Sequence, residues 1–192
     1  MSSPLDLRPA ADRMARLVAG VPARALDHPT PCEEYSVGDL LDHIGGSALA
    51  FTAAAVKQPL GGAGSGDAAN LDAGWQQRIP ATLATLADSW SEPDAWTGMT
   101  GAGGVELPGE VAGVVALDEL VIHGWDLAKA TGQAAGYDGP GLEAVLAMVE
   151  QFRAGGIEGL FGPPVPVPDD APLLDRILGV TGRDPRWEPP AQ

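Results

Sequence analysis

The chain has 192 residues, and its 11 lysines and arginines against 26 aspartates and glutamates give a formal net charge of −15 at pH 7. This length predicts one domain, and the hydrophobic fraction of 45% excludes a disordered chain. The excess of acidic residues argues against DNA, RNA or an anionic lipid surface as a partner, because phosphate binding requires clustered Lys and Arg side chains.

The sequence predicts neither a targeting segment nor an internal disulfide. No apolar run approaches the ~20 residues of a membrane span, and the first stretch of the chain carries charges where a signal peptide would be apolar. Cys32 is the only cysteine, which excludes an internal disulfide. Together these features predict a soluble cytoplasmic protein.

Apolar residues recur at helical spacing in five stretches, which predict a mainly helical protein. The first helix begins at Pro4 or Pro9, since either proline suits a first turn, and it ends before Gly20. The second begins after the N-cap Ser36, where Asp39 completes a capping box.

Three more helices are predicted farther along the chain. The third spans residues 71–90 and contains Pro80, where we expect a kink or a break. The fourth runs from about 110 to 131, with Gly132 as its C-cap. The fifth covers residues 140–153, where apolar side chains again share one face.

Glycine- and proline-rich stretches separate these helices. The run GGAGSG at 61–66 is typical of a flexible linker, because neither a preceding strand nor a following Lys-Ser/Thr supports a phosphate-binding loop. Residues 97–108 predict an irregular loop or a small hairpin. Residues 163–168 predict an extended stretch, and 172–178 a short helix.

Several amphipathic helices without a convincing sheet predict an all-α protein built as a four-helix bundle. We expect one domain over residues 1–192. Its helical core covers about 4–154, and a short proline-rich C-terminal extension follows at 155–192.

The stretch from Asp118 to Asp126 (DELVIHGWD) carries the candidate chemistry. Glu119 and His123 are four residues apart, which places both side chains on one helix face. A carboxylate and an imidazole so placed can bind one divalent metal, and His43 on the second helix is the natural third ligand. Three such ligands leave coordination positions open, as in catalytic zinc sites, although ligand type alone also allows nickel, iron or manganese.

The Glu119–His123 pair and its acidic neighbours also have interpretations that involve no metal. A Glu–His pair four residues apart is more often a partly solvated contact than a metal site. Asp126 is equally consistent with orienting the imidazole of His123 and with pairing with Lys129 or facing solvent. Asp118 and Asp42 adjoin the proposed ligands on other sides of their helices, and we expect both to be solvated.

Cys32 and His28 lie in a proline-marked loop before the second helix. We expect the thiol of Cys32 to be inert, because its neighbours Glu33 and Glu34 disfavour a thiolate. His28 is expected to be a loop or cap residue rather than a ligand.

Four motifs resemble a known family: DHPTPC at 27–32, LLDHIGG at 40–46, ELVIHGWDLAKATG at 119–132 and TGRDP at 181–185. In them the chain resembles the actinobacterial metal-binding proteins of the DinB-like superfamily, which are related to the N-terminal domain of mycothiol-dependent maleylpyruvate isomerase. The resemblance covers nearly the whole chain. It implies a DinB-like four-helix bundle that binds one divalent metal, usually zinc, through His43, Glu119 and His123.

The resemblance also implies a chemistry. Related enzymes use the low-molecular-weight thiol mycothiol, whose thiolate the metal would activate at neutral pH. We therefore expect a thiol-dependent transferase or isomerase acting on a small molecule, in a cytoplasmic homodimer. The isomerase has a separate C-terminal domain, whereas only residues 154–192 follow the fifth helix here. The resemblance therefore supports the metal site better than it supports the isomerase reaction.

Two alternatives stay open. One is a non-catalytic metal-binding or small-ligand-binding bundle, because the sequence supplies no obvious general base or nucleophile beyond a metal. The other is a purely structural bundle in which Glu119 and His123 form a solvated contact.

Overall fold

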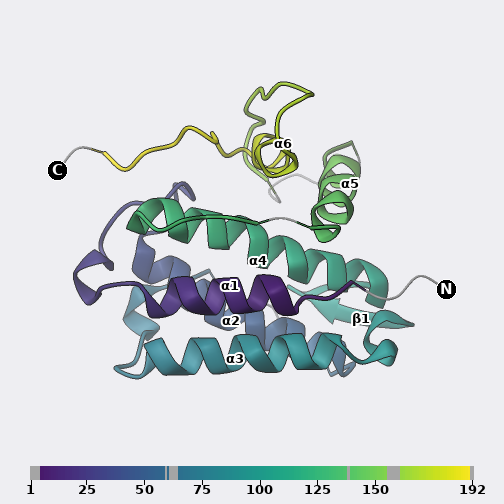
Figure 1. The fold of residues 1–192 in the computed structure, drawn as a ribbon. Coiled ribbons are helices and arrows are strands. Elements are labelled where there is room, and N and C mark those ends of the chain that lie inside the picture. The colour runs from purple at the N-terminus through teal and green to yellow at the C-terminus, as the bar shows by residue number, and fades with distance from the viewer. Residues whose placement is uncertain (1–4, 59, 61–64, 138, 155–160, 191–192) are drawn as a thin grey trace.

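The computed structural model describes residues 5–58, 60, 65–137, 139–154 and 161–190. Four helices form a bundle (Figure 1): α1 (Arg8–Ala19), α2 (Val37–Ala55), α3 (Trp75–Trp90) and α4 (Gly109–Thr131). Both α1 and α2 pack against α3 and against α4, so each of the four has two neighbours in the bundle. The predicted all-α four-helix bundle is therefore confirmed.

Two further helices cover the side of α4 that faces away from α2 and α3 (Figure 1). They are α5 (Gly141–Ala154), which packs on α4, and α6 (Leu173–Val180), which packs on α5. Because α4 is covered on both sides, its buried residues extend around most of the helix rather than forming a single stripe. This central position lets α4 present side chains both to the bundle and to the C-terminal extension.

Short elements connect the helices. Three are 3₁₀ turns: η1 (Ala23–Ala25), η2 (Ala68–Asn70) and η3 (Pro93–Trp96). The strands β1 (Met99–Ala102) and β2 (Val105–Pro108) pair antiparallel and form the hairpin that was one of two expectations for this stretch. Its turn contains Gly103 and Gly104, both at positive φ, where glycine is least strained.

The helix ends follow local sequence chemistry. α1 begins at Arg8 with Pro9 in its first turn, so the later of the two predicted starts is correct. At α2 the hydroxyl of Ser36 accepts a hydrogen bond from the backbone N–H of Asp39, whose carboxylate accepts one from the N–H of Ser36. Gly132 ends α4 at a φ of 68°, as predicted for a C-cap.

Pro80 lies inside α3, and the helix continues through it. Of the two expectations for this position, a kink or a break, the break is therefore wrong. Ile79 and Leu83, on either side of the proline, are 0% and 1% exposed, and their burial against the bundle keeps the helix continuous. The helix begins at Trp75 rather than at the predicted residue 71, since Leu71 lies in an irregular stretch before it. The predicted linker at 61–66 lies mostly outside the described residues.

The core is one apolar cluster to which all four bundle helices contribute. A hydrogen bond between helices pairs one polar atom of this core: the indole N–H of Trp90 on α3 donates to the backbone carbonyl of Phe51 on α2 at 3.0 Å. Among the described residues, no helix combines the length and apolar character needed to cross a membrane.

Candidate metal centre

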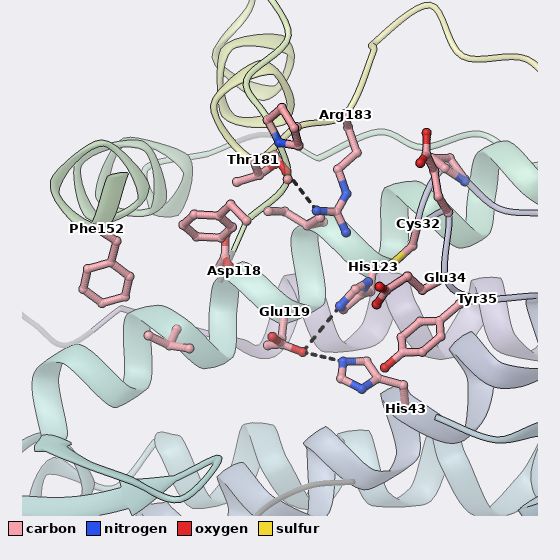
Figure 2. A pocket seen from close by; sticks show the side chains of 18 of the residues that line it. Cys32, Glu34, Tyr35, His43, Asp118, Glu119, His123, Phe152, Thr181 and Arg183 are labelled. Atoms are coloured by element: carbon pink, nitrogen blue, oxygen red, sulfur yellow. Dashed lines mark hydrogen bonds and ion pairs between the residues drawn. The ribbon is translucent and has the colours of Figure 1, made fainter. Parts of the chain in front are cut away.

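Three side chains from two neighbouring helices converge in the bundle: His43 from α2, and Glu119 and His123 from α4 (Figure 2). Oε2 of Glu119 lies 3.1 Å from Nε2 of His43 and 3.7 Å from Nε2 of His123. The two imidazole rings meet edge to face, with centroids 4.7 Å apart. The structure thus brings together all three residues that the sequence singled out.

The spacing of these atoms suits a divalent cation. One ligand atom from each side chain lies within 4.8 Å of the other two. Ligands about 2.0–2.1 Å from a tetrahedral zinc ion stand roughly 3.3 Å apart, which is close to the two distances measured from Glu119. Two imidazoles and one carboxylate also form a donor set that zinc, nickel or iron accepts.

Glu119 is held as a carboxylate. Its burial alone would raise its pKa, but the hydrogen bond with His43 and the nearby imidazole of His123 outweigh that effect and lower the pKa to about 2. Ser47, one helical turn after His43, also donates its hydroxyl to Oε2 at 3.1 Å. At neutral pH a metal therefore displaces no proton from this ligand.

A second carboxylate lies behind His123. Asp126 is fully buried, and its Oδ2 lies 3.1 Å from Nδ1 of His123 and 3.2 Å from Nη2 of Arg183. The structure thus decides between the two expectations for Asp126: it orients the imidazole. Lys129 instead lies over the ring of Trp125, 5.8 Å from its centroid.

The cluster opens onto a cavity of about 600 Å³. The cavity lies between α4, α5, the loop before α2 and the C-terminal extension (Figure 2). Its polar wall includes Cys32, Tyr35 and Arg183, and its apolar wall includes Ile122 and Phe152. The extension therefore completes a site whose metal-binding side chains belong to the bundle.

Cys32 lines this cavity but is poorly suited to act as a nucleophile. Burial raises the pKa of its thiol, and although Arg183 opposes that effect, Asp126 and Glu34 add to it. The thiol therefore stays protonated at neutral pH. The prediction of an inert cysteine is consistent with this result, although burial contributes more than the acidic neighbours that were its basis.

Asp118 is not solvated, contrary to the sequence-based expectation. It is only 6% exposed, because α5 and the C-terminal extension cover this side of α4, and it lines the same cavity. Burial, together with the charge of Glu119, raises its pKa well above the ordinary value. Asp42 is half-buried and accepts hydrogen bonds from the N–H of Asp67 and the side chain of Asn70.

Three residues of the site had no role assigned from the sequence. Ser47 follows His43 by four residues, a spacing that could have indicated a shared helix face. Arg183 stands in a recognised motif, but its contact with Asp126 spans 57 residues and no local pattern predicts it. The burial of Asp118 could not be predicted without knowing which segments cover α4.

This fold and site define a DinB-like helical bundle with a candidate divalent-metal centre. A family model described as the mycothiol maleylpyruvate isomerase N-terminal domain matches residues 7–128, and the chain belongs to this family. Uncharacterized proteins of two Mycobacterium tuberculosis strains are each 30% identical to it over 185 residues, which cover 92% of this chain and 95% of theirs.

The structure is also similar to a solved one, the crystal structure of the mycothiol-dependent maleylpyruvate isomerase. The TM-score is 0.67 at 16% identity, over 96% of this chain and 93% of that chain. At this identity the likeness shows the fold. Because the match covers 96% of this chain, the shared fold extends past the bundle into the C-terminal extension.

Proposed function

We propose that the protein binds one divalent metal ion, zinc or another such as nickel, through His43, Glu119 and His123. The observation that carries the proposal is the convergence of three donor atoms within 4.8 Å of one another on the wall of a cavity of about 600 Å³. Three protein ligands leave a coordination position for a small molecule, as in catalytic rather than structural zinc sites.

We further propose that the reaction is a thiol-dependent transfer or isomerisation of a small molecule, with mycothiol or a similar thiol as cosubstrate. Membership of the family supports this choice. A zinc ion at the cluster would supply one thing: it would bind the thiol as its thiolate at neutral pH. The protein side chains would orient the ligands, and the cavity would enclose the small molecule. Cys32 is not needed as a nucleophile.

Metal analysis of the purified chain tests the first part. We expect one divalent ion per wild-type chain and at least a hundredfold weaker affinity in His123→Ala, because a lost ligand leaves only two. His28→Ala is the matched control, since His28 lies in the loop before α2 and outside the cluster. Absence of metal from the wild type, or equal affinity in His123→Ala, would refute the site.

Turnover tests the second part. The metal-loaded chain is incubated with mycothiol and a panel of small electrophiles, maleylpyruvate included, and compared with chelator-treated protein. Metal-dependent consumption of the electrophile supports an enzyme. Tight binding of the thiol without turnover identifies the alternative, a non-catalytic metal- and ligand-binding bundle.

A further inference from the structure

Asp118 is a buried acid in the wall of the cavity, and its Oδ1 has no hydrogen-bond partner among the described residues. The residue is 6% exposed, and Oδ1 itself is buried. Neither carboxyl oxygen bonds to any group in the part of the chain that the structure describes. Leaving a buried polar group unpaired costs free energy that a hydrogen bond would recover. Because Asp118 lines the cavity, a ligand bound there can supply the missing partner.

The surroundings of Asp118 differ from those of the metal cluster. Val115, Asp118 and Ile122 follow one another at three- and four-residue spacing, so they form one line on α4, and all three line the cavity. Met148 and Phe152 of α5 continue this apolar wall. Asp118 is thus the acid of the otherwise apolar part of the cavity, next to the ligand cluster but on another line of the helix.

We propose that Asp118 is a specificity-determining residue, whose carboxyl group forms a hydrogen bond with a hydroxyl group of a ligand bound by its other end at the His43–Glu119–His123 cluster. The inference rests on the proposed metal site. A hydroxyl suits the position because it both donates and accepts, and it therefore pairs with the carboxyl group in either protonation state. The ligand class is a small thiol that carries a hydroxyl at a fixed distance from its sulfur.

The test uses the full chain loaded with cobalt(II), whose visible spectrum reports thiolate binding. Each ω-hydroxyalkanethiol in a series of increasing length is titrated beside the alkanethiol in which a methyl group replaces the hydroxyl. The ratio of the two Kd values at each length measures the preference for a hydroxyl. At the thiol length with the strongest preference, we expect the wild type to prefer the hydroxyl-bearing thiol about tenfold more than Asp118→Ala does.

Two controls keep the result specific. Asp118→Asn retains groups that donate and accept and should keep most of the preference. Glu34→Ala removes an exposed carboxylate from the same cavity and should leave the ratio unchanged. Metal-free Asp118→Ala should also melt above the wild type, because it removes an unpaired buried group.

The outcomes separate the two proposals. If both thiol series bind but the ratio is the same in wild type and Asp118→Ala, the role of Asp118 is refuted while the metal site stands. A lower melting temperature for metal-free Asp118→Ala would equally overturn it, since it would reveal a structural partner for the carboxyl group. If neither series binds the cobalt-loaded chain, the proposed function fails and this inference fails with it.

Discussion

Nδ1 of His123 and Oδ2 of Asp126 lie 3.1 Å apart, three residues along the same helix. Because a buried carboxylate only accepts hydrogen bonds, this contact requires the proton on Nδ1 and leaves the lone pair of a neutral imidazole on Nε2. Nε2 is the atom that faces Glu119. Asp126 thus sets the tautomer that a metal ligand needs, and Arg183 holds Asp126 in place.

Asp126→Asn should weaken divalent-metal binding by roughly 10- to 100-fold, the usual cost of losing a carboxylate behind a histidine ligand. The variant also leaves the guanidinium of Arg183 without its charged partner. Competition with a chromophoric chelator measures the affinity. Asp42→Asn makes the same substitution next to His43, at a side chain that bonds Asp67 and Asn70 instead of the cluster, and should bind metal like the wild type. Equal affinities in the two variants would contradict the role of Asp126.

Glu119 should make the metal-free protein sensitive to acid. Its pKa is about 2 in the folded chain and 4.5 for the ordinary carboxyl group. A lowered pKa stabilises the folded state above pH 4.5, and this stabilisation is lost as the pH falls from about 4.5 through about 2. Urea unfolding across this range should show the wild type losing stability relative to Glu119→Gln. Parallel curves for the two proteins would contradict the ion pairs with His43 and His123.

Substitutions at Gly124 and Tyr137 should have non-additive effects on the free energy of unfolding. A Cβ at position 124 would collide with the buried hydroxyl of Tyr137, which has no hydrogen-bond partner among the described residues. Gly124→Ala should lower the free energy of unfolding by about 1–3 kcal/mol through overpacking, and Tyr137→Phe should raise it by about 1 kcal/mol. Urea unfolding of both single variants and the double variant tests this relationship. Additive effects would show that the two residues do not compete for the same space.

Ser36 should contribute to the stability of α2 without contributing to metal binding. Its hydrogen bonds with Asp39 hold the first turn of the helix and lower the pKa of that carboxyl group. Ser36→Ala should therefore lower the free energy of unfolding by about 1 kcal/mol. Metal affinity should not change, because His43 lies two turns farther along α2. A drop in affinity as large as that of Asp126→Asn would show that the cap also positions the ligand.

Local chemistry explains the predictions that succeeded. The capping box at Ser36 and the glycine at position 132 locate the ends of α2 and α4 because each acts within one turn of helix. The Glu119–His123 spacing places both side chains on one face for the same reason. Of the kink or break expected at Pro80, the break is wrong, because apolar burial on both sides of the proline outweighs the lost backbone hydrogen bond.

The amino-acid sequence by itself determined the helical class, most helix ends and the three candidate metal ligands, since these follow from periodicity, capping and side-chain type. Only the tertiary structure decided the surroundings of those ligands. Asp126 became an orienting group and Asp118 a buried acid because α5 and the extension fold over α4. Such coverage brings together residues far apart in the chain, and helical periodicity describes only neighbours within a turn or two.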